Sequence, residues 1–155
     1  MEDFFNHIRK GDLSTVRQML NENPQLLGNR DQRGSTPLIL AAYYDQAEIV
    51  DLFLQKGANV DEKDTSGNTA LMGVCFKGFE EVAQKLIEAG ANVDARNAMG
   101  TSCLIFAVTF KRETIAKLLI EYGADVNARD ARGDTALDHA RMQGLQTLVN
   151  LLEKN

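Results

Sequence analysis

The chain has few of the residues from which catalytic and metal sites are usually built. Among its 155 residues are two cysteines and two histidines. Two cysteines form neither a disulfide framework nor a zinc-ligand set. The sequence also has no phosphate-binding loop, no nucleophile elbow and no H-E-x-x-H segment. It therefore predicts no metal site, no cofactor and no enzyme activity.

Long apolar runs are also missing. The longest, from Cys103 to Phe110, is far shorter than the roughly 18 residues that suggest a membrane span. The N-terminus carries acidic residues where a signal peptide has a basic end. Cys75 and Cys103 both lie in apolar segments, as small buried side chains of a reducing compartment do. We therefore expect a cytoplasmic protein that does not contact membranes.

Basic residues are outnumbered by acidic ones. The chain has 17 Lys and Arg against 22 Asp and Glu, a net charge of -5. This charge repels a phosphate backbone, so nucleic acid is not expected as a partner. A hydrophobic content of 44% and a charged content of 25% are typical of one folded domain.

What the sequence does contain is a repeat of 33 residues. The segment GANVDEKD at Gly57 returns as GANVDARN at Gly90 and as GADVNARD at Gly123. A period of this size indicates stacked units, each too small to form a core alone. The successive frames begin at Asp31, Asp64, Asn97 and Asp130.

Each frame predicts a turn, a short helix, a loop and a second helix. The turns DQRG, DTSG, NAMG and DARG begin with Asp or Asn and end with Gly, as type I turns prefer. A Thr or Ser then stands where its hydroxyl can cap a helix, at Thr36, Thr69, Ser102 and Thr135. The second pattern has apolar residues at helical spacing and ends at Gly. The segment CLIFAVTF has strand-like composition, but its register in the repeat predicts a helix.

The unit resembles the ankyrin repeat. STPLILAA followed by VDLFLQKGANVD is similar to its pattern T-P-L-H-x-A, which falls on Thr36 to Ala41. The resemblance implies an all-α ankyrin solenoid of stacked helix-turn-helix units with β-turn or hairpin loops. The chain departs from the pattern at the His position, which holds Ile39, Met72, Ile105 and Asp138, and keeps the Pro only at Pro37.

We expect one domain over residues 1–155. It divides into an N-terminal capping unit (1–30), three full repeats (31–63, 64–96 and 97–129) and a C-terminal capping repeat (130–155). Polar residues replace apolar ones in the terminal units, as at Gln18 and Arg141. Such positions suit units that have a neighbour on one side only.

The expected function is non-catalytic binding of another protein, as an adaptor, scaffold or inhibitor. Aromatic and Met side chains recur on the side of the first helices that faces away from the core, and interfaces concentrate these residue types. The resemblance implies that turn tips and first helices together form a concave binding surface. The candidate partner-binding residues are Arg33, Leu40, Tyr43, Tyr44, Ser66, Phe76, Lys77, Met99, Phe106, Phe110, Arg132, His139 and Met142.

Two alternatives remain open. A small-ligand-binding or catalytic protein could use the groove near Asp138 and His139. No nucleophile stands beside His139, which favours a solvent-facing histidine on the last inner helix. The second alternative concerns the oligomeric state. We expect a monomer, and the alternative is weak self-association through the same apolar face.

Overall fold

A computed structural model describes residues 2–155, and ten α-helices run through this part of the chain. They are α1 (Glu2–Lys10), α2 (Leu13–Glu22), α3 (Pro37–Tyr43), α4 (Ala47–Gln55), α5 (Ala70–Lys77), α6 (Glu80–Glu88), α7 (Cys103–Thr109), α8 (Glu113–Glu121), α9 (Ala136–Met142) and α10 (Gln146–Glu153), with a 3-10 helix, η1 (Pro24–Gly28), after α2. The β pairing found in this part is one isolated bridge, between Arg96 and Ser102. The expected all-α class is confirmed. None of the described helices is long and apolar enough to cross a membrane.

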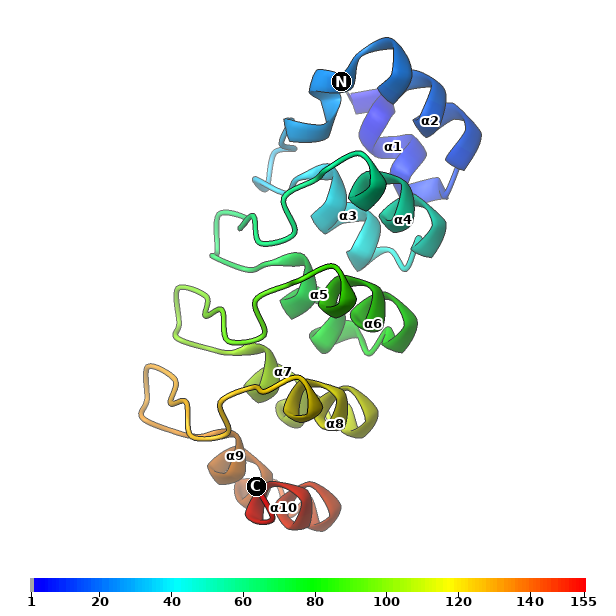
Figure 1. Cartoon of the computed structure of the whole chain (residues 1–155). Helices are drawn as coiled ribbons and strands as arrows, with labels where there is room; N and C mark the ends of the chain where they lie inside the picture. Colours follow the sequence, from blue (N-terminus) through cyan, green and yellow to red (C-terminus); the bar gives the residue numbers. More distant parts are fainter. Residues whose placement is uncertain (1) are drawn as a thin grey trace.

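The helices form pairs that stack in chain order (Figure 1). We call α1, α3, α5, α7 and α9 the inner row and the even-numbered helices the outer row. Each inner helix packs against its outer partner and against the inner helices before and after it. The long connections between successive pairs all project to the same side of the stack (Figure 1). The expected solenoid of helix-turn-helix units is therefore present.

One continuous core runs through the stack. The leucines at the same repeat position, Leu38, Leu71 and Leu104, are each at most 2% exposed. Leu137, their equivalent in the last pair, is partly buried against the same core. The segment from Cys103 to Thr109 is helical, so the register of the repeat overrides its strand-like composition. Burial against neighbouring units therefore decides the local structure.

Hydroxyl caps begin the inner helices as expected. The side-chain oxygen of Thr36 accepts a hydrogen bond from the Ile39 amide at 3.2 Å, and Ser102 accepts from Ile105 at the same distance. Thr69 and Thr135 do the same for α5 and α9. Each hydroxyl satisfies an amide that the first helical turn leaves without a partner.

The projecting turns are joined to one another. Within the second turn, Asp64 Oδ1 accepts the amides of Ser66 and Asn68, each at 2.9 Å. The Ala98 amide of the next turn donates to the Ser66 carbonyl at 3.1 Å. Equivalent bonds join the first turn to the second, from the Thr65 hydroxyl, and the third to the fourth. Each turn and the turn that follows it are thus joined in one hydrogen-bonded network.

Two residues adopt a backbone conformation that suits glycine. Asp45 and Lys111 have φ values of 58° and 64°, at positions where other pairs carry Gly11, Gly78 and Gly144. A left-handed conformation costs an ordinary residue about 1–2 kcal/mol, and Asp tolerates it better than Lys. Because Lys111 has the less suitable side chain, it carries the larger strain.

We expect Lys111→Gly to stabilise the protein. Relief of the strain, less the greater freedom of glycine in the unfolded chain, leaves a gain of roughly 0.5–1 kcal/mol in the free energy of unfolding. Urea denaturation measures it. Lys111→Ala is the control, because alanine keeps the strained conformation and should give no gain. Equal gains from both variants would show that the lysine side chain, and not the backbone, is responsible.

Candidate partner-binding face

The turn tips and the exposed side of the inner row form one surface, which we call the inner face. Most of the side chains predicted to bind a partner are accessible there. Arg33, Tyr43, Tyr44, Ser66, Lys77, Met99, Phe110, Arg132 and Met142 are exposed, whereas Phe76, Phe106 and His139 are partly buried and Leu40 is buried.

The prediction that Leu40 is exposed on the binding surface is wrong. Its side chain is 6% exposed, whereas the sequence argument placed it on the open side of the first inner helix. The degenerate first unit supplies a full inner helix, α1, which packs against α3. Leu40 contributes to the floor of a hollow and does not project from the surface.

Aromatic rings connect successive inner helices. The Tyr43 and Phe76 rings lie nearly parallel with centroids 6.4 Å apart, and Phe110 meets Phe76 edge-on at 4.6 Å. Phe106 stacks on Phe110 at 6.4 Å, and Tyr44 lies beside Tyr43 at 6.1 Å. Each ring pair stabilises by about 0.5–1.5 kcal/mol beyond its buried area. The result is a continuous aromatic strip that still exposes Tyr43, Tyr44 and Phe110 by 38–45%.

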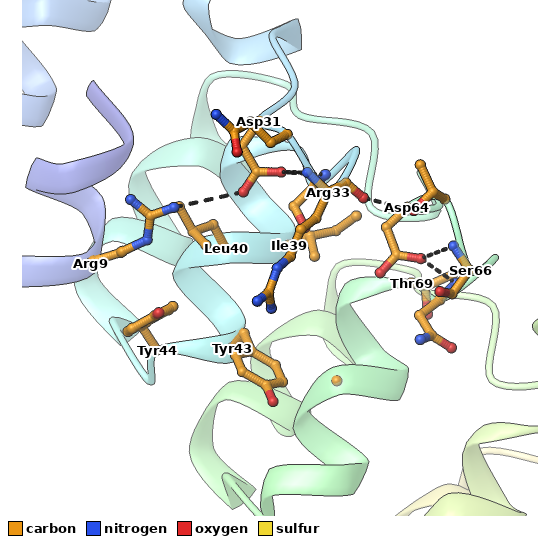
Figure 2. Close-up of a pocket in the computed structure, with 15 residues that line it drawn as sticks. Arg9, Asp31, Arg33, Ile39, Leu40, Tyr43, Tyr44, Asp64, Ser66 and Thr69 are labelled. Carbon is orange, nitrogen blue, oxygen red and sulfur yellow. Dashed lines mark hydrogen bonds and ion pairs between the residues drawn. The ribbon is translucent and has the colours of Figure 1, made fainter. Parts of the chain in front are cut away.

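A hollow of about 740 Å³ opens at the N-terminal end of this strip (Figure 2). The first two turns and α3 form its walls. It is lined by Arg9, Asp31, Gln32, Arg33, Ser35, Ile39, Leu40, Tyr43, Tyr44, Asp64, Thr65, Ser66, Asn68, Thr69 and Gly73.

Arg9 is a lining residue that the sequence reasoning missed. It comes from α1 and its guanidinium lies 3.8 Å from the Asp31 carboxylate. The first unit does not follow the repeat pattern, so Arg9 could not be aligned with the candidate binding positions of the other units. The available signal was the periodic apolar set of α1, Phe4, Phe5 and Ile8, which places Arg9 on the edge of that helix.

Asp138 and His139 do not act as a pair. The Asp138 carboxylate accepts the Thr135 amide at 2.9 Å in a capping box. The His139 Nε2 lies 2.8 Å from Asp130 Oδ2, and its side chain is 19% exposed. The expected solvent-facing histidine is therefore wrong, because the imidazole is held against the last turn. Neither group is positioned on the other for proton transfer.

The pKa values of these carboxyl groups follow from their contacts. Burial raises the pKa of Asp130, but the hydrogen bonds from His139 and from the amides of Asp134 and Arg132 outweigh burial and hold it below its ordinary value. The Thr135 amide and hydroxyl lower the pKa of Asp138. Both groups are thus ionised acceptors that stabilise the turn and the start of α9.

One side-chain cluster has metal-ligating geometry. Asp130, Asp134 and His139 each offer one ligand atom, and these atoms lie within 4.8 Å of one another. The Asp130 carboxylate is already hydrogen-bonded within the turn, since Oδ1 accepts the amides of Arg132 and Asp134 and Oδ2 contacts His139. The turn network accounts for the arrangement.

The two thiols lie in the core. Cys75 and Cys103 are both free and both 0% exposed. Burial raises the pKa of Cys75 well above its ordinary value, with the neighbouring Cys103 adding to the effect. A neutral, inaccessible thiol is a packing group and not a nucleophile.

Comparison with known proteins agrees with this architecture. A family model described as ankyrin repeats (3 copies) matches residues 4–97, and another described as ankyrin repeats (many copies) matches residues 86–140. No curated protein matches the chain. With the helix pairs, capped inner helices and linked turns already described, these matches establish that the chain belongs to the ankyrin repeat family.

Proposed function

We propose that the protein is a non-catalytic interaction module that binds another protein through the inner face, as an adaptor, scaffold or inhibitor. Ankyrin repeats are generally protein–protein interaction modules. One observation carries the proposal for this surface. Of the six large hydrophobic side chains that are exposed in residues 2–155, five lie on the inner face: Tyr43, Tyr44, Met99, Phe110 and Met142.

The distribution of these side chains fits an interface. Exposed aromatic and Met residues gathered on one face mark a binding surface, whereas scattered ones need no explanation. Tyr44 and Phe110 stand at equivalent positions two units apart, and Phe110 meets the partly buried Phe76. Between them Lys77 adds a polar element, since its Nζ lies 5.1 Å from the Tyr43 ring centroid. Apolar anchors beside polar groups are the usual anatomy of protein interfaces.

The terminal pairs complete the proposal. We assign the cap roles to α1–α2 and α9–α10, because polar groups occupy their outer positions. Gln18 is exposed on α2, and Arg141 pairs with Glu153 across the last helix pair at 2.7 Å. The two buried free thiols fit a reducing compartment, and cytoplasmic residence is part of the proposal.

The double variant Tyr44→Ala, Phe110→Ala tests the face. We expect it to abolish capture of the protein partner from a native lysate, with little change in the melting temperature, because both rings are substantially exposed. Affinity capture with mass spectrometry, followed by binding measurements on the purified partner, gives the readout.

Tyr122 provides the matched control. It is 47% exposed but follows the outer helix α8. Tyr122→Ala should therefore retain partner binding. The proposal fails if the double variant still binds its partner, or if Tyr122→Ala loses binding to the same degree. If the double variant instead unfolds, single replacements at Tyr44 and Phe110, compared with Tyr122→Ala at a temperature where all are folded, decide the matter.

A further inference from the structure

Charge is segregated between the two rows of helices. In the three central pairs, the inner helices α3, α5 and α7 contain one charged residue, Lys77. The matching outer helices contain two lysines, Lys85 and Lys117, and seven acids, Glu48, Asp51, Glu80, Glu81, Glu88, Glu113 and Glu121. The central outer helices therefore carry a net charge of -5 (two lysines less seven acids), whereas the central inner helices carry +1.

Most carboxylate oxygens inside the hollow are already engaged. Asp31 is 8% exposed at its side chain; its Oδ1 accepts the amides of Arg33 and Ser35, both at 2.9 Å, and its Oδ2 faces Arg9. Asp64 Oδ1 accepts the two amides of its own turn, whereas Asp64 Oδ2 has no such contact within residues 2–155. Three of the four oxygens are therefore directed into the turns or toward Arg9.

Unlike Arg9, two cations lack a carboxylate partner among the described residues: Arg33, which lines the hollow, and Lys77, which lies beside it over the Tyr43 ring. The Arg33 side chain extends over the hollow in the direction of Tyr43 (Figure 2). Within residues 2–155 Arg33 makes its hydrogen bonds through its backbone and none through its guanidinium. The ammonium of Lys77 meets no carboxylate in the same part of the chain and lies over the Tyr43 ring. A planar guanidinium with free donors favours a carboxylate, which it binds through two parallel hydrogen bonds.

We infer that the hollow binds an extended acidic segment of a partner protein. An Asp or Glu side chain of the segment pairs with Arg33, a second acid lies near Lys77, and an adjacent apolar side chain packs on Tyr43 and Tyr44. This inference rests on the proposed function and specifies the chemistry of its partner. Single carboxylates fit better than a phosphoryl group, because phosphate recognition usually employs a cluster of arginines. Among the described residues that line this hollow, Arg33 is the one arginine without a carboxylate partner.

Arg17 is the internal control for Arg33. Both side chains are exposed, but Arg17 lies on the outer helix α2. It does not line the hollow, and it is not one of the side chains of the inner face. Arg17 therefore offers the same charge and side-chain type outside the proposed site.

A random peptide library displayed on phage and selected on the purified protein tests the inference. We expect winning sequences to place Asp or Glu next to Tyr, Phe or Leu. A labelled synthetic copy of a winner should bind about tenfold or more weakly to Arg33→Glu. Binding to Arg17→Glu should change by no more than about twofold, as for an exposed charge outside the site. Exchanging the key peptide acid for Lys should restore binding to Arg33→Glu.

Several results would overturn the inference. The first is a set of winning peptides that are neutral or basic. The second is a synthetic phosphorylated peptide that binds where its Glu counterpart does not. The others are equal losses of binding in Arg33→Glu and Arg17→Glu, and a library that gives no winning peptide. Saturable self-association that Arg33→Glu abolishes would assign the hollow to a second copy of the chain. The two proposals can fail separately. If the library gives no acidic peptide but the Tyr44→Ala, Phe110→Ala variant loses its protein partner, the inferred acidic segment is wrong and the proposed function stands.

Discussion

Leu104→Ala is expected to lower the free energy of unfolding by about 2–5 kcal/mol, which is a large share of the roughly 5–15 kcal/mol available to a domain. Leu104 is 1% exposed on α7, which packs against α5, α8 and α9. Removing its branched end leaves a cavity that three helices border. Because these helices are tied to both neighbouring pairs, they are poorly able to close the cavity. Urea denaturation followed by far-UV circular dichroism measures the loss.

Leu137→Ala is the matched control. Leu137 occupies the same repeat position in the last described helix pair, where it is only partly buried against the core. Its replacement should therefore cost about 1–2 kcal/mol. Equal losses at the two positions would contradict the idea that a unit draws its stability from neighbours on both sides.

Gly67→Ala is expected to destabilise the protein by about 3 kcal/mol, because two penalties add. The backbone at Gly67 has φ 80°, and an added Cβ would lie 2.9 Å from the backbone nitrogen of Ala98. That nitrogen donates to the Ser66 carbonyl in the link between turns. The methyl group therefore strains its own turn and pushes away the next one. The change is measured as a shift in the urea midpoint.

Gly133→Ala separates the two penalties. Gly133 has φ 86° at the equivalent position of the last turn, and an added Cβ there meets no atom within 4 Å. Its replacement should show the conformational penalty alone, about 1–2 kcal/mol. If the two alanine variants lose the same stability, the contact between turns contributes nothing.

The fold was predictable because period outweighs local composition. The segment from Cys103 to Thr109 favours a strand by residue type, yet the 33-residue register predicts α7 correctly. The hydroxyl caps were predictable for a similar reason, since a capping Thr or Ser acts within one helical turn. Features that lie within one unit, or that recur at the same position in successive units, can therefore be predicted from the repeat.

The details of the site were less predictable, because they depend on side-chain contacts that cannot be inferred from equivalent positions in the repeat. Leu40 is buried since α1 belongs to a unit outside the pattern. His139 turns toward Asp130, nine residues earlier, and not toward its neighbour Asp138. The free guanidinium of Arg33 depends on where Asp31 directs its oxygens. Helical spacing locates a face, but it does not say which charges on that face are already paired.

The hydrogen bonds between turns have a consequence for how a ligand is received. The Thr65 hydroxyl donates a hydrogen bond to the Arg33 carbonyl at 2.9 Å, so the two turns that form the walls of the hollow are joined to each other. A receptor that needs no rearrangement loses little entropy upon complex formation, and its affinity is set by the fit of the incoming chain. We therefore expect association to proceed in a single kinetic step, with selectivity between ligands expressed mainly in their residence times.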